Sequence, residues 1–321
     1  MARPAFLDRI PPTSPTVMRR LAILTVIGQA GIAVTGSVVR VTGSGLGCPT
    51  WPQCFPGSLV PTPHPEVAAL TQWIEFSNRL LTFVLVVATG LAFLAAVNTR
   101  PRRRRLTWLA LAQPLGVVAQ AVIGGFVVLA GLVWWSVAIH FMVSMFFVWM
   151  AVQLVDAAGD GDGPATRVVP GAVRGLIATS SVVLVALLAA GTFVTASGPH
   201  AGDAKTPRLG LGVQATAQLH SDILFAYLGL VVGIGFALAA TGASRRMWRR
   251  YTALVVLVIA QGALGGIQYA LGVPEVLVSF HVLGAGLVTI GAAFLWSGTT
   301  ERTHPTDAVA PTADLVGTGR A

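Results

Sequence analysis

The sequence predicts an all-α membrane protein with eight transmembrane helices, arranged as two duplicated four-helix bundles with both termini in the cytoplasm. Three observations support this fold class. Of the 321 residues, 54% are hydrophobic and only 10% are charged. Long segments carry no formal charge, and one spaced pattern of residues occurs twice. A helix that crosses a bilayer needs about 20 apolar residues, and a helix pairs its backbone groups internally within lipid.

Eight segments meet this length requirement. The charge-free stretch Leu106–Val155 is long enough for two helices with a tight turn near Gly131. The predicted spans are 19–40, 71–98, 106–130, 133–155, 174–196, 214–241, 252–271 and 275–297.

The arginines predict the orientation. They cluster before the first span and between spans two and three, four and five, and six and seven, whereas the opposite loops hold only Arg40, Lys205 and Arg208. Clusters of Lys and Arg mark cytoplasmic loops, so we expect a multi-pass protein of the bacterial plasma membrane. The net charge of +9 then reflects contact with the lipid bilayer, and we expect no nucleic-acid partner.

The repeated pattern predicts the domain organisation. Gln120, Gly124, Gly125, Gly131 and His140 recur at one constant spacing as Gln261, Gly265, Gly266, Gly272 and His281. An even number of spans in each copy places both copies the same way up. The predicted segments are a cytoplasmic N-terminal segment (1–18), a first four-helix repeat (19–155), a cytoplasmic linker (156–173), a second repeat (174–297) and a disordered cytoplasmic tail (298–321).

Histidines within these apolar spans are candidate ligands. An imidazole in hydrocarbon is costly without a partner, and in a helical bundle that partner is commonly a metal or haem iron. His220 and His281 lie at similar predicted depth towards the external leaflet, so they can ligate one haem iron from both sides. The alternative is two unrelated histidines that bond to nearby backbone.

The first repeat differs, because its corresponding positions are Asn78 and His140. Asparagine is a poor iron ligand, so a haem there has one histidine and an open coordination position. Open coordination suits substrate chemistry, while bis-histidine ligation favours electron transfer. The sequence therefore predicts a reaction site in the first repeat and a relay in the second.

Charged residues flank the first site. Glu75 and Arg79 are four residues apart and can pair on one helix face. Glu75 is either a general base or half of an interfacial ion pair, and both interpretations stay open. Arg40 either binds a carboxylate such as a haem propionate or anchors its helix at the interface.

Cys48 and Cys54 lie in the first predicted external loop. An oxidising location favours a disulfide, with free thiols or a metal pair as the alternatives.

Together these residues give a family resemblance. The segment Gly36 to Cys54 reads GSVVRVTGSGLGCPTWPQC, and it is followed by Glu75, Asn78 and Arg79. With the repeated Gln-x-x-x-Gly-Gly segments and the three histidines, the chain resembles haem A synthase over about residues 19–297. Members of this family commonly have a histidine where this chain has Asn78, which leaves His140 as the first repeat's histidine candidate.

The resemblance implies an oxidoreductase that converts a porphyrin methyl group of haem O to a formyl group, making haem A for terminal oxidases. It implies haem b at His220 and His281, a haem O site with His140, Asn78, Arg79 and Arg40, a catalytic Glu75 and a Cys48–Cys54 disulfide. Candidate partners are the substrate haem O, a haem O synthase (protohaem farnesyltransferase), an electron acceptor and a second copy of the chain. The alternative functions are a non-catalytic dihaem cytochrome b electron carrier and, less favoured, a duplicated transporter.

Overall fold

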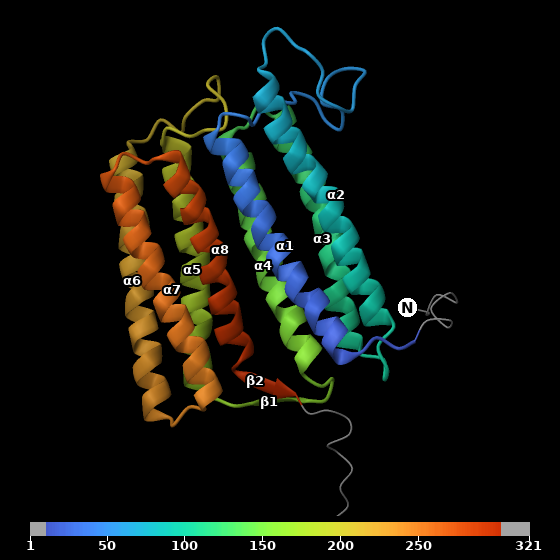
Figure 1. Ribbon diagram of the computed structural model, residues 1–321. Helices are drawn as coiled ribbons and strands as arrows, with labels where there is room; N and C mark the ends of the chain where they lie inside the picture. The colour runs from blue at the N-terminus through green and yellow to red at the C-terminus, as the bar shows by residue number, and fades with distance from the viewer. Residues whose placement is uncertain (1–10, 303–321) are drawn as a thin grey trace, which may run out of the picture.

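Eight long helices make up most of the protein (Figure 1). The computed structural model describes residues 11–302. In this part of the chain, all eight helices are long and apolar enough to cross a membrane, which confirms the predicted all-α, eight-helix class. The helices are α1 (Pro15–Val41), α2 (Ala69–Val97), α3 (Arg104–Leu129), α4 (Trp134–Gly159), α5 (Gly171–Ser197), α6 (Val213–Ala240), α7 (Arg245–Ala270) and α8 (Glu275–Ser297).

Most helix ends lie within a few residues of their predicted positions, and α7 is the main exception. It begins at Arg245, well before the predicted residue 252. Ser244 caps this helix, because its side chain accepts a hydrogen bond from the backbone N–H of Met247 at 3.2 Å. A capped first turn satisfies a free backbone donor. The helix can therefore begin in the arginine-rich interface rather than at the edge of the hydrocarbon.

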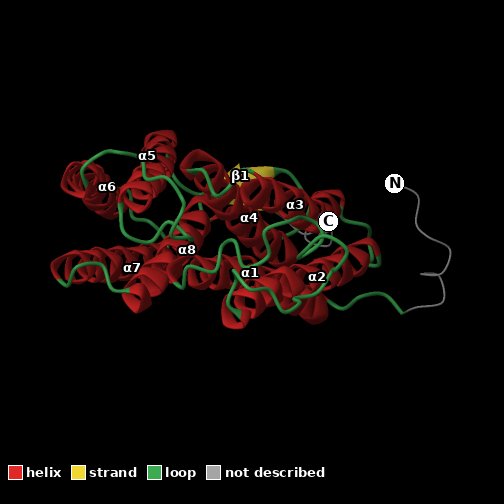
Figure 2. Cartoon of the chain, turned by 90° about the horizontal axis from the view of Figure 1, so that it is seen from above, coloured by secondary structure: helices red, strands yellow, loops and turns green. Residues whose placement is uncertain are grey.

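The helices form two groups that lie side by side (Figure 2). We call α1–α4 the first half and α5–α8 the second half. In the first half every helix packs against its sequence neighbour, and α1 also packs on α4. In the second half α5 packs on α6 and α7 packs on α8, but α6 meets α7 at only a few positions. Helices α1, α4 and α8 join the two halves.

Matching turns connect the last two helices of each half. Gly131 and Leu132 have φ values of 67° and 59°, and Gly272 and Val273 have φ values of 76° and 63°. Left-handed backbone is uncommon for residues other than glycine. Its occurrence at corresponding positions in the two halves agrees with the repeat that the sequence predicts.

A small sheet corrects the predicted linker and tail. Strand β1 (Ala165–Arg167) pairs antiparallel with β2 (Thr300–Arg302). The linker predicted at 156–173 is therefore partly ordered, and the predicted disordered tail contains a strand before residue 303. The polar composition of both segments suggested disorder, but their pairing satisfies the backbone groups. Residues 303–321 of the predicted tail and residues 1–10 of the predicted N-terminal segment lie outside the described residues.

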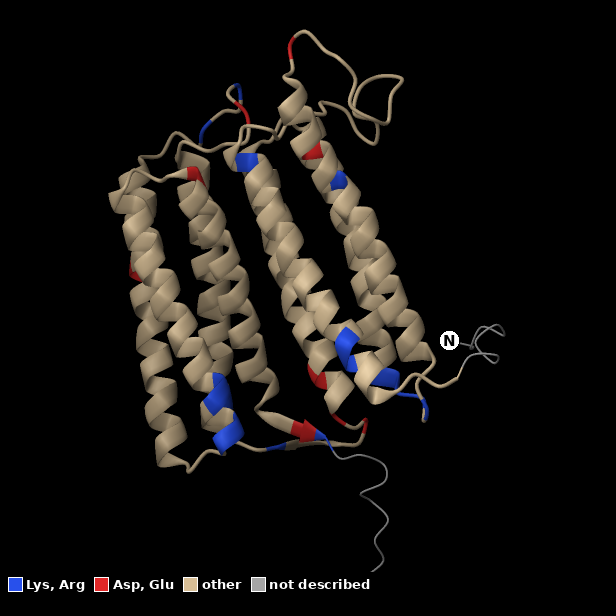
Figure 3. Cartoon of the chain, viewed as in Figure 1, with Lys and Arg blue, Asp and Glu red and all other residues tan. Residues whose placement is uncertain are grey.

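Ion pairs hold the same end of the molecule together. Asp156, expected in the linker, belongs to α4, is buried, and accepts a hydrogen bond from Arg250 of α7 at 2.8 Å. Arg246 lies 3.8 Å from the same carboxylate and 3.5 Å from Glu301. Most arginines lie at this end (Figure 3), which we predict to face the cytoplasm.

Candidate functional site

Two imidazole rings face each other inside the second half. His220 of α6 and His281 of α8 have ring centroids 6.4 Å apart, with their planes at 67°. A histidine nitrogen binds a transition metal at about 2 Å, so two axial imidazoles on one metal place their ring centres about 6 Å apart. The observed spacing fits ligation of one iron between the rings.

The remaining ring nitrogens support this interpretation. His220 Nδ1 lies 3.1 Å from the carbonyl oxygen of Leu187, so Nδ1–H donates and Nε2 is left available to a metal. Ligating histidines usually bind a carbonyl or carboxylate through their other ring nitrogen. His281 Nδ1 is buried and has no hydrogen-bond partner among the described residues. Only His220 of the pair therefore has a protein partner for its second ring nitrogen.

Glycines give both rings their space. A Cβ atom at Gly191 of α5 would lie 3.2 Å from His220 Cε1, and one at Gly265 of α7 would lie 3.0 Å from His281 Cε1. Both distances are tighter than ordinary van der Waals contact. Gln261 then fixes the helix below the second ring, because its Nε2 donates to the carbonyl oxygen of His281 at 2.8 Å.

The pair suits a haem iron better than a bare metal ion. A structural or catalytic metal ion usually has at least three protein ligands. Within residues 11–302, no group of three or more His, Cys, Asp or Glu side chains could hold a metal ion. A haem supplies the equatorial ligands itself and needs only axial ones.

The first half repeats the surroundings of one histidine. A Cβ at Gly124 would lie 3.3 Å from His140 Cε1. Gln120 Nε2 donates to the carbonyl oxygen of His140 at 2.9 Å and to the hydroxyl of Ser144 at 2.5 Å. His140 Nδ1 is buried without a partner among the described residues, as is His281 Nδ1.

Among residues 11–302, no second imidazole lies against His140 as His220 lies against His281. Asn78 of α2 instead accepts a hydrogen bond through Oδ1 from the hydroxyl of Thr35 on α1, at 2.7 Å. A Cβ atom at Gly36, next to Thr35, would have no neighbour within 4 Å, whereas one at Gly191 of α5 would contact His220.

Glu75 and Arg79 form the ion pair that their spacing predicted. Glu75 is buried, and its Oε1 lies 2.5 Å from Arg79 Nη2. The other carboxylate oxygen accepts the backbone N–H of Cys48 at 2.7 Å. Arg79 also donates to the carbonyl oxygens of Thr50 at 2.9 Å and Cys48 at 2.7 Å. The pair thus holds the external loop onto α2.

A disulfide closes that loop, as predicted: Cys48 and Cys54 are bonded and fully buried. Between them, the indole of Trp51 lies directly against Gly125 of α3, where a Cβ atom would overlap the ring. Gly125 adjoins Gly124, which packs against His140. Trp51 therefore covers the first-half site from the loop side. Trp51 was not among the predicted site residues. Its position between two cysteines and the Gly-Gly pair within a span were the two sequence signals that could have indicated it.

Arg40 lies at the junction of the two halves rather than beside Glu75. Its Nε donates to the carbonyl oxygen of His200 at 2.6 Å, and its Nη2 to that of Thr195 at 3.2 Å. His200 Nε2 is 2.8 Å from the carbonyl oxygen of Val273. His200 is half-buried, and these bonds link α1 to the turns of the second half.

Asp222 does not orient His220. It is exposed on α6 and accepts a hydrogen bond from Gln218 Nε2 at 2.7 Å. Because His220 and Asp222 are two residues apart on a helix, they point in different directions. His220 contacts Leu187 and Gly191, and Asn78 contacts Thr35. Only a comparison of the two repeats could have indicated these three neighbours from the sequence.

Comparison with known proteins agrees with this architecture. The family model described as cytochrome oxidase assembly protein (COX15-CtaA) matches residues 19–207, and the chain belongs to this family. Curated proteins named heme A synthase are similar to it. The protein of Shouchella clausii is 30% identical over 158 residues, covering 48% of this chain and 50% of the relative. That of Halalkalibacterium halodurans is 28% identical over 175 residues, covering 53% and 57%.

The chain thus spans about half the length of the curated relatives it matches. The family match includes Glu75, Asn78 and His140 but ends before His220. The pairing of His220 with His281 therefore rests on the geometry of this chain.

Proposed function

We propose that this chain is a haem A synthase, which oxidises a methyl group of haem O to a formyl group. The observation that carries the proposal is the difference between the halves: two imidazoles at 6.4 Å in the second, and in the first a single histidine, His140, with Asn78 bonded to Thr35. A closed site beside an open one in one chain suits a reaction that removes electrons from a bound substrate. The names of the relatives and the family of the chain support the same assignment.

The second half holds a haem b in this proposal, with His220 and His281 as its axial ligands. When bound, haem b supplies one-electron transfer. The chain's own part is to fix both rings: the Leu187 carbonyl holds His220 Nδ1–H, and Gly265 leaves room beside His281. The α5–α6 and α7–α8 pairs make few contacts with each other, which suits a flat macrocycle inserted between them.

The first half holds the substrate haem O, with His140 on one side of it. Asn78 is held by the Thr35 hydroxyl, so the other side stays accessible. Glu75 accepts a proton from water or from the substrate methyl group. Cys48 N–H and Arg79 hold the carboxylate in position for this transfer. Arg79 thereby belongs to the proposed substrate site, and Arg40, which also links α1 to the second half, remains assigned to that site.

The location follows from the arginine distribution. We place the protein in the bacterial plasma membrane, with the disulfide loop outside and both haem sites towards the external leaflet. An outer, lipid-accessible site suits haem O because its farnesyl tail is apolar. A haem O synthase and a second copy of the chain remain the proposed protein partners.

Product analysis in a host that lacks haem A tests this function. The chain is co-expressed with a haem O synthase, the haems are extracted and separated, and their masses are measured by mass spectrometry. We expect a formyl porphyrin from the wild type and from Glu66→Gln, which changes an exposed loop carboxylate. We expect none from Glu75→Gln, which keeps its size and can still accept from Cys48 N–H. Unchanged haem O in a wild type that retains two haems would instead establish the electron carrier.

A further inference from the structure

The arginines at the predicted cytoplasmic end divide into two sets. One set faces acidic groups: Arg103 lies 3.3 Å from Asp162, and Arg250 lies 2.8 Å from Asp156. The other set has no ion-pair or hydrogen-bond partner among the described residues and is exposed. Among its members are Arg102 and Arg104 at the start of α3, and Arg245 and Arg249 at the start of α7.

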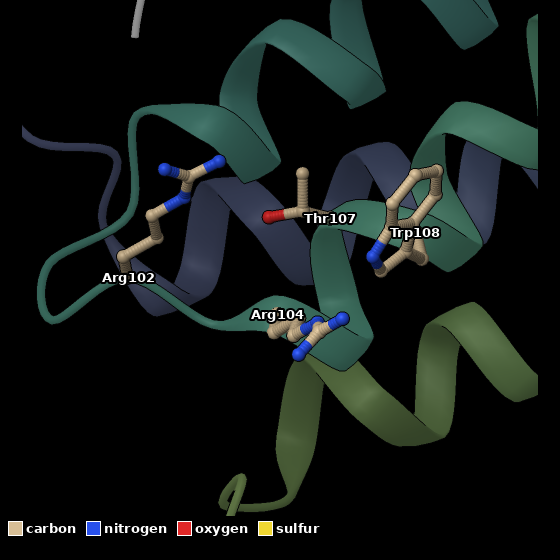
Figure 4. A pocket seen from close by; sticks show the side chains of 4 residues that line it. All are labelled: Arg102, Arg104, Thr107 and Trp108. Carbon is tan, nitrogen blue, oxygen red and sulfur yellow. The ribbon is translucent and has the colours of Figure 1, made fainter. Parts of the chain in front are cut away.

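The two unpaired arginines of α3 line one pocket, and the two of α7 line another. The α3 pocket has a volume of about 360 Å³ and is lined by Arg102, Arg104, Thr107 and Trp108 (Figure 4). Trp108 is 52% exposed beside the arginines. Tryptophan is enriched where a membrane meets water, so the pocket lies at the level of lipid head groups.

The α7 pocket is larger, about 590 Å³, and has an apolar extension. Arg245, Trp248 and Arg249 line its outer part, and Thr252, Ala253, Val256 and Leu257 continue it along α7. Arg245, Arg249, Ala253 and Val256 share one helix face, and Val256 is 60% exposed. The pocket therefore presents cations at one end and an apolar wall at the other.

We propose that each half carries a binding site for a phospholipid with a net negative head group, at the start of α3 and at the start of α7. The unpaired guanidinium groups bind the phosphate. In the α7 site an acyl chain lies along Ala253 and Val256. A free phosphate would leave that apolar wall without a partner, which is why the occupant is a lipid.

The two sites occur at corresponding positions of the predicted repeat, since Arg104 and Arg245 each begin the third helix of their half. This inference does not depend on the proposed enzymatic activity. It assigns a role to four of the arginines that the ion pairs leave unused.

Native mass spectrometry of the full chain tests it, with phosphatidylglycerol titrated against phosphatidylcholine of identical acyl chains. We expect two phosphatidylglycerol molecules to bind in preference. Replacing two arginines near an anionic head group weakens binding by roughly 30-fold, so R102Q/R104Q and R245Q/R249Q each lose one of them. The matched control R19Q/R20Q removes two exposed arginines of α1 that line neither pocket, and it keeps both.

Further variants and a competition experiment show whether the bound phosphate belongs to a lipid or is free in solution. Ala253→Trp fills the apolar wall and should weaken only the α7 site, while R245K/R249K should retain it. Inorganic phosphate should not displace the lipid. Equal binding of both lipids, equal loss in R19Q/R20Q, or displacement by inorganic phosphate would overturn the proposal.

Discussion

The two halves of the molecule surround a histidine in the same way but complete the site differently. His140 and His281 each lie against a glycine, and each has its carbonyl oxygen bound by a glutamine. The second half adds His220 at 6.4 Å from His281. The first half has Asn78 bound to Thr35 in the matching place. In the proposed function, this one side chain separates a site with two histidine ligands from a site with one.

The loops increase the difference. Trp51 of the disulfide loop covers Gly125 in the first half. In the second half, a Cβ atom placed on the corresponding Gly266 would have no neighbour within 4 Å. The loop therefore contacts α3 beside the glycine that packs on His140, and Gly266 has no such cover. In the proposed function, one repeated scaffold supports a reaction site and a relay without a change of fold.

His220→Ala should have the largest effect, because it removes a ligand that only the second half possesses. We expect haem b retention to weaken more than about 100-fold, with loss of the bis-histidine absorption spectrum. His64→Ala, in the external loop, is the control and should change neither. Retention of the bis-histidine spectrum in His220→Ala would break the comparison.

Asn78→His should make the first half resemble the second. A histidine at position 78 supplies the second imidazole that the first half lacks, so we expect a second bis-histidine haem by near-infrared magnetic circular dichroism. Asn78→Gln adds length without a strong ligand and should not produce the new signal. An unaltered spectrum in Asn78→His would show that position 78 does not face the haem.

Gly265→Val should disturb the second half more than Gly266→Val. A Cβ at Gly265 already lies 3.0 Å from the His281 ring, whereas Gly266 meets nothing. We expect roughly tenfold weaker haem b retention in the first variant, measured by transfer to apomyoglobin. Similar transfer rates in both variants would contradict the packing argument.

Cys48→Ser/Cys54→Ser should have the smallest effect and should act on the first half alone. Loss of a disulfide that closes a short loop costs about 2 kcal/mol, here in the attachment of the loop that carries Trp51. We expect lower haem O affinity, measured by equilibrium titration, and an unchanged bis-histidine spectrum. A loss of haem b in this variant would mean that the halves do not act separately.

Local sequence patterns predicted much of this structure. The eight spans follow from runs of apolar residues, and the Glu75–Arg79 pair follows from helix periodicity. The position of the two cysteines in one short loop indicated the disulfide. Each of these features depends on residues that are close in the sequence.

Features that depend on distant contacts could not be predicted. Arg40 donates to His200 and Thr195, which lie more than a hundred residues away. Trp51 reaches Gly125 across the first half, and β2 pairs with β1 from the other end of the described chain. Composition gives no information about such partners, because any polar or exposed segment could supply them.

Carbon monoxide titration of the reduced protein, loaded with both haems, tests the central claim most directly. A site closed by His220 and His281 refuses an added ligand, and a site with His140 opposite Asn78 accepts one. We predict that carbon monoxide shifts the spectrum of one haem and leaves the other unchanged, and that Asn78→His abolishes the shift. Binding to both haems, or to neither, would contradict the division of the chain into an open and a closed site.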